Sequence, residues 1–437
     1  HDEELAMADE DSGELPPTRK VASDEDGGEL RPTPDPELVR AYSPHLVSLS
    51  GHTASLFGYV KLPLRLWGGQ EEKITLEDGG SVVLHWWTSH RLPTRAMRPI
   101  VLLVHGINNS SSTPYIQYTC EQLEATGFDA VVLNMRGHGH GNHISSNRLY
   151  TGRADADLRA VCERIRVTRN PPALYAVGFS MGANQVLAFL GGGGGGAFID
   201  AAVAVSCPFD LAQLAEYFRT GTPRLYGALI AQPLKRLLWE GRHHLRLTRQ
   251  QFVRGMAALS IEEFDTAIQV PLLGLSSAEE YWRTNSCIHH LDHITTPTLV
   301  IHAIDDPLIP PYVFPQSRLR ANPHVEVVVT ERGGHIGWVA GKTPLRQNWT
   351  DKLIARWLRR FDQSRTADGD GSVNMPSGVV VGAARRQNSG GDGGGSDGGG
   401  DGGGGCGLSA CRPAAANEPP HGAGTSLDGL FVYQSKL

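Results

Sequence analysis

The pattern Gly178-Phe179-Ser180-Met181-Gly182 places a serine between two glycines. The preceding residues 173–177 form a short apolar run typical of a strand, and the following residues carry apolar side chains at helical spacing. A strand, a sharp turn and a helix are the context of a nucleophile elbow, in which a strained backbone exposes the serine hydroxyl. A chain with 52 glycines can match the pattern by chance, so it is these flanks that predict Ser180 as a nucleophile.

A serine hydroxyl is a weak nucleophile at neutral pH and needs a base within hydrogen-bond reach. An imidazole base in turn needs a carboxylate that holds its tautomer. Both residue types follow apolar runs further along the chain: Asp305 and Asp306 come after residues 298–302, and His335 comes after residues 325–330 and two glycines. These positions predict a nucleophile, a carboxylate and a base at three strand ends. The residues alone do not separate the two neighbouring aspartates.

Short apolar runs and amphipathic segments alternate along the chain and predict the elements that position these residues. We predict a β-hairpin over residues 73–76 and 81–87. Further strands are predicted over residues 100–104, 130–134, 174–177, 201–205, 298–302 and 325–330. Helices are predicted from about residue 113, over 154–167, after Ser180, and over 348–361. This order favours an α/β fold with a doubly wound, mostly parallel sheet.

Two segments interrupt the alternation. Residues 191–196 are six consecutive glycines, which we interpret as a flexible connection, without a phosphate-binding role because no P-loop lysine follows. Residues 208–293 contain helical segments and no clear strand. An insertion at this point should lie over the carboxyl ends of the strands, so we expect it to form a cap on the site.

The two ends of the chain differ from the middle in composition. Residues 1–30 carry eleven acidic residues against two basic ones, and residues 363–437 contain twenty glycines. Too few large apolar side chains are present there to offset the entropy cost of ordering, so we expect both segments 1–37 and 363–437 to be disordered. The chain's net charge of −6 therefore comes from its two ends. For the whole protein we expect no nucleic-acid partner.

The sequence carries little information on location. No apolar run approaches the eighteen or so residues that a membrane-spanning helix needs. The chain begins with His1 rather than Met, so a signal or anchor could precede it, and both an intracellular soluble and a membrane-associated protein stay open. The six cysteines show no tight spacing, which favours buried or incidental thiols over a disulfide framework.

Eight short motifs lie between the predicted hairpin and the predicted closing helix, a span that covers some two thirds of the chain. They are Leu103-Val104-His105-Gly106, Asn134-Met135-Arg136-Gly137, Arg148-Leu149-Tyr150-Thr151-Gly152, Gly178 to Gly182, Pro208-Phe209-Asp210-Leu211, Glu280-Tyr281-Trp282, Asp305-Asp306-Pro307 and Gly333-Gly334-His335-Ile336-Gly337-Trp338. With them the chain resembles the α/β-hydrolase superfamily, and specifically its YheT-like branch, which includes plant embryogenesis-associated hydrolases and animal abhydrolase-domain phospholipases. The resemblance implies an α/β-hydrolase domain over residues 38–362, with the cap at about 208–293.

The resemblance also implies roles for the candidate residues. Ser180 corresponds to the nucleophile and His335 to the base. The family's acid stands three residues before an Ile/Val-Pro pair, which selects Asp306 over Asp305 as the orienting carboxylate. The mechanism requires no cofactor and no metal.

Two backbone N–H groups should form the oxyanion hole, that of Met181 directly after the nucleophile and that of Ile107 after the His105-Gly106 strand end. Asn108 and Asn109 each stand in an Asn-x-Ser glycosylation pattern. A glycan there would cover the oxyanion loop, so we interpret both patterns as chance matches.

The activity that this constellation predicts is hydrolysis of a carboxylic ester through an acyl-serine intermediate. The expected substrates are small-molecule esters, either lipid-like (an acylglycerol or a phospholipid) or of short to medium chain length. Two alternatives stay open: an alcohol O-acyltransferase, which shares the acyl-serine, and a non-catalytic binding protein on the same fold.

A cluster of histidines offers a rival chemistry, since nearby histidines can ligate zinc. Its members are His138, His140 and His143 after a strand end, with His289, His290 and His293 in the cap. No cysteine or glutamate completes a ligand set at useful spacing. We therefore expect loop histidines that are solvated or line the substrate site.

One cap segment combines basic and apolar residues with Glu240 as its only acid. Its basic residues are Lys235, Arg236, Arg242, Arg246 and Arg249, and its apolar ones are Leu234, Leu237, Leu238, Trp239, Leu245 and Leu247. Such a segment can lie in a membrane interface, which would allow peripheral membrane association through the cap. The alternative is that the leucines pack on the hydrolase core and the bases are merely solvated.

Overall fold

The structure, a computed structural model, describes residues 42–48, 50–59, 69–87, 97–340, 345–346, 348–367, 374–375 and 379–380. The predicted disordered segment 1–37 and most of the segment 363–437 lie outside the described residues. The four cysteines in the described part of the chain are free and buried, as expected.

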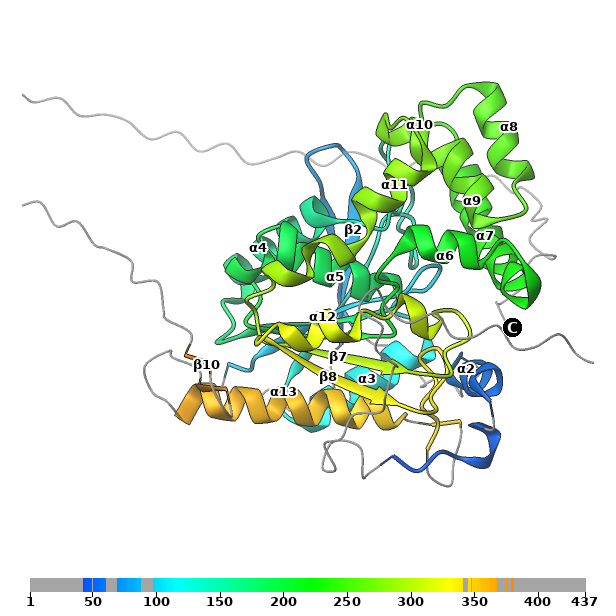
Figure 1. Ribbon diagram of the computed structural model, residues 1–437. Helices are drawn as coiled ribbons and strands as arrows, with labels where there is room; N and C mark the ends of the chain where they lie inside the picture. Colours follow the sequence, from blue (N-terminus) through cyan, green and yellow to red (C-terminus); the bar gives the residue numbers. More distant parts are fainter. Residues whose placement is uncertain are drawn as a thin grey trace, which may run out of the picture. The chain divides into compact units, whose positions relative to one another are not determined.

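An eight-stranded sheet forms the centre of the fold (Figure 1). Its strands in chain order are β1 Glu71–Thr75, β2 Ser81–Trp87, β3 Ile100–Val104, β4 Asp129–Asn134, β5 Leu174–Phe179, β6 Ala201–Val205, β7 Thr298–Ala303 and β8 Val325–Thr330. In space the order is β1-β2-β4-β3-β5-β6-β7-β8. The pairs β1–β2 and β2–β4 are antiparallel and the others are parallel. The predicted fold class, a mostly parallel doubly wound sheet, is confirmed.

Helices cover both faces of the sheet, which explains why the central strands are mostly apolar. Every residue of β3, β5, β6 and β7 is buried. One face packs on α3 (Pro114–Ala125) and α13 (Trp349–Ala367), and the other packs on α4 (Asp155–Arg169), α5 (Met181–Gly192) and α12 (Gln316–Ala321). A strand buried on both faces cannot alternate polar and apolar residues, which is the signal that the sequence carries.

Most predicted elements lie within two residues of those observed, and two segments differ by more. The glycine run is not simply a flexible connection, because Gly191 and Gly192 complete α5 and Gly195–Ala197 forms a 3-10 turn, η2. A Cβ on Gly191 would lie 2.1 Å from the backbone oxygen of His290, so glycine permits close helix packing there. The closing helix α13 continues beyond residue 362 to Ala367, and Asp362 accepts a hydrogen bond from the hydroxyl of Tyr175 at 2.7 Å.

The segment expected to be a cap is helical throughout. Its elements are α6 Leu211–Tyr217, α7 Gly221–Gly241, α8 Arg249–Ala257, α9 Ile261–Phe264, the π-turn η3 Asp265–Gln269, α10 Val270–Leu273, α11 Ala278–Asn285 and the 3-10 helix η4 Cys287–His293. In Figure 1, α6 and α7 lie on the side toward which the arrows of β7 and β8 point. Among the described residues, no helix combines the length and the apolar character that crossing a membrane would take.

The remaining elements were not predicted from the sequence. The 3-10 turn η1 Leu46–Ser48 and the helix α2 Gly51–Tyr59 precede the sheet. A further 3-10 turn, η5 Pro311–Val313, follows β7, and the two-residue strands β9 Asn374–Met375 and β10 Val379–Val380 pair after α13. The buried residues of α2 are small rather than large and apolar. Helical periodicity of apolar residues therefore provides no signal for it.

Asp265 at the start of η3 makes stability depend on pH. Its carboxylate is buried and accepts the Trp282 indole N–H at 3.0 Å, but burial raises the pKa of Asp265 from its ordinary value of 3.8 to about 7. The folded state therefore holds this proton more tightly than the unfolded state, and the resulting stability is lost as pH rises from about 4 through about 7.

We expect Asp265→Asn to raise the free energy of unfolding at pH 8, by up to about 4 kcal/mol, because each unit of pKa is worth about 1.4 kcal/mol. The asparagine oxygen can still accept the Trp282 N–H. At pH 5 the increase in the free energy of unfolding should be clearly smaller. Urea unfolding of the wild type and the variant at both pH values measures this, and an equal change at the two pH values would contradict the assignment.

Candidate active site

Ser180 sits on a sharply strained turn between β5 and α5. Its backbone has φ 51° and ψ −121°, a region that residues with a side chain rarely adopt, and its N–H donates to the Val205 carbonyl at 2.8 Å. A Cβ on Gly178 would lie 2.5 Å from the Gly182 oxygen, and one on Gly182 would lie 2.2 Å from the Val104 oxygen. Both glycines of the pattern are thus required by the close approach of strand and helix.

The structure brings His335 to both Ser180 and Asp306. The His335 Nε2 lies 2.9 Å from the Ser180 Oγ, and its Nδ1 lies 2.8 Å from the Asp306 Oδ2. All three side chains are buried, Ser180 being 8% exposed. A histidine whose Nδ1–H is held by a carboxylate presents an unprotonated Nε2 to the serine hydroxyl, which is the arrangement that lets it accept the hydroxyl proton.

The two neighbouring aspartates have different partners. The Oδ1 of Asp306 accepts the N–H groups of Leu308 and Ile309 at 2.9 and 3.0 Å, and its Oδ2 meets the histidine. Asp305 instead accepts the Gly334 N–H at 2.8 Å. Asp306 therefore faces the imidazole of His335, while Asp305 contacts the backbone of the loop that carries His335.

The surroundings keep Asp306 ionised. Burial alone would raise the pKa of Asp306, but the charge of the imidazole ring of His335 and its hydrogen bond hold that pKa below the usual value. For Asp305, burial outweighs the backbone hydrogen bonds and raises the pKa. The two neighbouring carboxyl groups thus differ in environment, which lowers the pKa of Asp306 and raises that of Asp305.

The oxyanion-hole candidates lie against the serine. A Cβ on Gly106 would come within 3.2 Å of the Ser180 Cβ, so the turn that begins at Gly106 borders the nucleophile. Among the hydrogen bonds of the described residues, neither the Ile107 N–H nor the Met181 N–H donates to a protein acceptor. Both N–H groups thus keep their hydrogen-bonding capacity for a ligand.

The oxyanion loop is fixed by its two asparagines. The Asn109 amide donates to the Ile107 carbonyl at 2.8 Å, and the Asn108 amide donates to the Ile230 carbonyl of α7 at 2.8 Å. Both amide nitrogens are thus engaged internally, which agrees with the interpretation of the glycosylation patterns as chance matches. The contact from Asn108 also ties the loop to the cap, and no pattern in the sequence indicates this contact.

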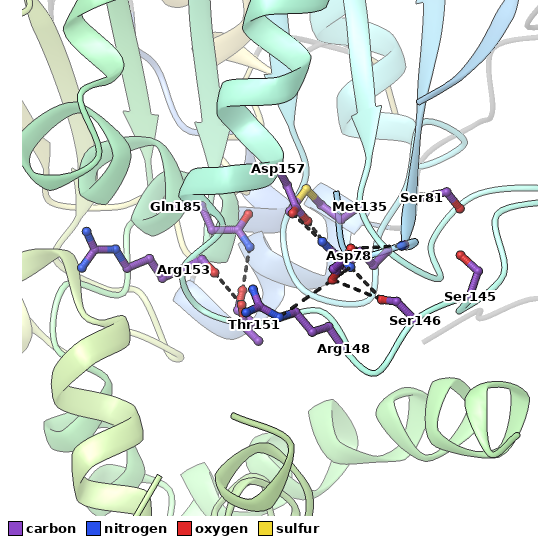
Figure 2. A network of polar contacts seen from close by, with 12 residues as sticks. Asp78, Ser81, Met135, Ser145, Ser146, Arg148, Thr151, Arg153, Asp157 and Gln185 are labelled. Atoms are coloured by element: carbon purple, nitrogen blue, oxygen red, sulfur yellow. Dashed lines mark hydrogen bonds and ion pairs between the residues drawn. The ribbon is translucent and has the colours of Figure 1, made fainter. Parts of the chain in front are cut away.

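The Asn-Met-Arg-Gly motif proves to be structural. Arg136 donates to both carboxylate oxygens of Asp157 and to Asp78, each at 2.7 Å. Figure 2 shows Asp157, Asp78 and Ser146 in one network with Arg148. Arg136 and Asp157 are both buried, and removing Arg136 would leave the buried carboxylate of Asp157 without this partner, at a cost of about 3–5 kcal/mol.

The histidine cluster does not assemble into a ligand set. No group of three histidine, cysteine or acidic side chains is arranged for a metal ion within the described part of the chain. His138 is buried rather than solvated, its Nδ1 lies 2.9 Å from the Arg136 carbonyl oxygen, and its ring packs between those of His105 and Tyr150. Burial lowers the pKa of His138 to about 4, so this ring is neutral at physiological pH.

The sequence is similar to known proteins over the part that carries this site. The profile of the α/β-hydrolase fold matches residues 99–339, more than half of the chain. The chain belongs to the α/β-hydrolase family. The matched span contains all five residues expected at the site, and it begins after α2.

Among the relatives of this chain, EMB8 and YheT fit the YheT-like branch of this family. The chain is 28% identical to the embryogenesis-associated protein EMB8 of Picea glauca, over 68% of this chain and 67% of that protein. It is 29% identical to the esterase YheT of Escherichia coli, described as putative, over 68% and 86%. It is 28% identical to the monoacylglycerol lipase of Saccharomyces cerevisiae, over 62% and 61%. These similarities support a hydrolase.

The two aspartates allow a paired test. We expect Asp306→Asn to lower kcat by about 10³- to 10⁴-fold, because an amide neither holds the imidazole tautomer nor stabilises its charged form. Asp305→Asn should change kcat less than about threefold, since the amide oxygen can still accept the Gly334 N–H. Steady-state kinetics on a p-nitrophenyl ester measure both, and similar losses in the two variants would contradict the assignment.

Proposed function

We propose that this hydrolase cleaves carboxylic esters through an acyl-serine intermediate. His335 takes the proton of the Ser180 hydroxyl as the oxygen attacks the ester carbonyl, and Asp306 stabilises the resulting imidazolium. The imidazolium then returns the proton to the leaving alcohol. Water, deprotonated by the same histidine, then attacks the acyl carbon. The bond from that carbon to the Ser180 Oγ breaks, the imidazolium returns its proton to the Oγ, and the acid is released. The contacts of His335 with Ser180 and Asp306, at 2.9 and 2.8 Å, are the observation that carries the proposal.

The negative charge of each tetrahedral intermediate would be stabilised by the N–H groups of Ile107 and Met181. Such preorganised donors are worth about 10²- to 10³-fold in rate in acyl transfer. The support is that the turn carrying Ile107 lies against Ser180 and that neither N–H has a protein acceptor among the described residues. No cofactor enters this scheme.

We propose that the substrates are lipid-like esters, such as an acylglycerol or a phospholipid. Two half-buried side chains next to the nucleophile support an apolar acyl group. Ile107 packs against a cluster of cap residues that includes Leu237 and Phe264, and Met181 packs against another that includes Leu211. The name of the yeast relative, a monoacylglycerol lipase, points to the same class. Short- and medium-chain esters are the alternative substrates, since the same apolar side chains could contact their acyl groups.

Two other functions fit the same geometry. An alcohol that replaces water in the second step would make the protein an O-acyltransferase, since both reactions pass through the acyl-serine. A non-catalytic binding protein is disfavoured because the serine, histidine and aspartate are all present and in contact.

Ser180 tests the scheme directly. We expect Ser180→Ala to abolish labelling by a fluorophosphonate and to lower kcat at least ~10³-fold, because the triad members act as a unit. Turnover of p-nitrophenyl esters, acylglycerols and phosphatidylcholines, with and without an added alcohol, would then define the substrate and separate hydrolysis from transfer. Full esterase activity in the alanine variant would refute the scheme.

We further propose that the cap contacts anionic membranes through the outer face of α7. Four of the leucines that the sequence offered for a membrane-facing surface do not contribute to this face. Leu234, Leu237, Leu238 and Leu245 are instead buried in the cap. The exposed apolar side chains of α7 are Leu225, Leu229 and Trp239, at 62, 55 and 52% exposure. Helical geometry at 100° per residue brings these three to one side.

The charge around this face complements an anionic surface. Residues 221–257 contain seven Lys or Arg residues and one acid. The Arg242 guanidinium lies over the Trp239 ring, 4.5 Å from its centroid, so a base and an aromatic ring share one patch. Arg236 is paired with Glu240 at 2.7 Å, which removes one base from the available charge.

We expect the protein to co-sediment with phosphatidylserine-containing vesicles more strongly than with pure phosphatidylcholine vesicles, and less at high salt. Arg242→Glu should weaken binding at least ~10-fold, since each base near such a surface contributes about 1 kcal/mol. Trp239→Ala should weaken binding to both kinds of vesicle. The control is Arg356→Glu, an exposed change on α13. Vesicle binding that does not depend on lipid charge or salt, and that is unchanged in both cap variants, would overturn the proposal.

A further inference from the structure

The helix α2 approaches the loop of His335 with almost no space between the backbones. A Cβ on Gly51 would lie 1.6 Å from the Asp305 carbonyl oxygen, and one on Gly58 would lie 2.8 Å from the backbone of Gly337. On the loop side, a Cβ on Gly334 would lie 2.4 Å from the Gly51 oxygen. Glycines on both sides thus bring α2 into backbone contact with the loop.

Ser55 of α2 makes the polar contact at this interface. Its Oγ accepts the N–H of His335 itself at 2.7 Å and donates to the Gly51 carbonyl, one turn earlier, at 2.6 Å. The hydrogen bond donated to the Gly51 carbonyl fixes the orientation of the Ser55 hydroxyl, so that its lone pairs face the backbone N–H of His335. Ser55 is buried, and no other acceptor for the His335 N–H is found among the described residues.

The histidine loop is therefore held from two directions. Asp305 accepts the N–H of Gly334, and Ser55 accepts the N–H of the next residue, His335. Both bonds fix the backbone from which the imidazole projects. The side chain must reach Ser180 and Asp306 at the same time, so a small rotation of this backbone would lengthen at least one of those two contacts.

We propose that Ser55 is a positioning residue for the histidine. The inference rests on the proposed function, because it assigns Ser55 a role only through His335. The α2 helix lies outside the span matched by the family profile and has nine residues, too few to be stable on its own in water. Its packing on the loop, and a contact of His52 with Tyr226 of α7, hold it in place.

Loss of the Ser55 hydroxyl should lower the chemical rate and leave substrate binding unchanged. Without an acceptor, the buried N–H of His335 would have to move to find one, and the imidazole would move with it. We expect Ser55→Ala to lower kcat by about 10- to 100-fold, the usual range for residues that orient a functional group, with KM within about twofold. The rate of labelling by a fluorophosphonate should fall by the same factor as kcat.

The experiment counts active sites, so that misfolded protein does not enter the result. Fluorophosphonate titration gives the concentration of competent Ser180, and kcat is expressed per titrated site. Thr53→Ala is the matched control: Thr53 is exposed and lies on the same helix, and within the described part of the chain its hydroxyl bonds only to Ser50, so its loss weakens α2 without touching the loop. This variant should keep wild-type kcat per site.

A double-mutant cycle decides whether Ser55 acts through the histidine. In a His335→Ala background, Ser55→Ala should lower the residual rate less than twofold, because its target is already gone. A wild-type kcat per site in Ser55→Ala, or an equal fold-loss with and without His335, would overturn the inference. If the alanine variant does not fold, Ser55→Cys, a weaker acceptor of similar size, replaces it with a loss expected in the same direction. Ser180→Ala tests the proposed function separately.

Discussion

The close approach of α5 to the strands β3 and β5 is the constraint on which the rest of the site depends. Gly182 lies so near the Val104 carbonyl that no side chain fits there, and this contact holds the N-terminus of α5 next to the turn at Gly106. The nucleophile and the two expected oxyanion donors are therefore positioned by a single backbone junction. The strain at Ser180 is tolerated because β5 is buried over its whole length and α5 is buried from Gly182 to Leu190.

The acid and the base depend on a second set of backbone contacts, on the other side of the serine. The two aspartates have complementary roles, since Asp306 is hydrogen-bonded within its own loop and to the imidazole, while Asp305 holds the loop of His335. Neighbouring residues can do this because the chain turns sharply after β7 and sends the two carboxylates to different partners. Two neighbouring acidic residues at a strand end can thus position one histidine in two ways. One contacts the imidazole ring and the other contacts the backbone of the histidine loop.

The sequence predicted the sheet, and it brought out Ser180 and His335 as candidates, because both leave strong local patterns. Strands buried on both faces are uninterrupted apolar runs, and Ser180 and His335 stand among glycines that a tight turn requires. The helix α2 leaves no such pattern, since its buried face consists of Gly51, Ala54, Ser55 and Gly58. Small residues at helical spacing indicate close backbone packing only when the partner segment is known, and that partner is 280 residues away in the chain.

The choice between Asp305 and Asp306 shows a different limit. Both residues follow the same strand and have the same charge, so residue type and position alone do not separate them. The resemblance to the family selects Asp306, and in the folded chain the hydrogen bonds distinguish the two. The leucines of the cap show a third limit. Their spacing predicts an apolar face, but whether that face meets the cap interior or the solvent depends on the neighbouring helices, and four of the six apolar residues in that segment pack inside.

The cap helix α7 links the site to the molecular surface. Its Ile230 carbonyl accepts the Asn108 amide of the oxyanion loop, and its Tyr226 contacts His52 on the helix that holds His335. The same helix exposes Leu225, Leu229 and Trp239 on its outer side. One element therefore bonds to Asn108 on one side of Ser180 and to α2 on the other, and it carries the exposed apolar face of the cap. A displacement of α7 would strain both contacts, because Asn108 is bonded to α7 directly and the histidine loop is linked to α7 through α2.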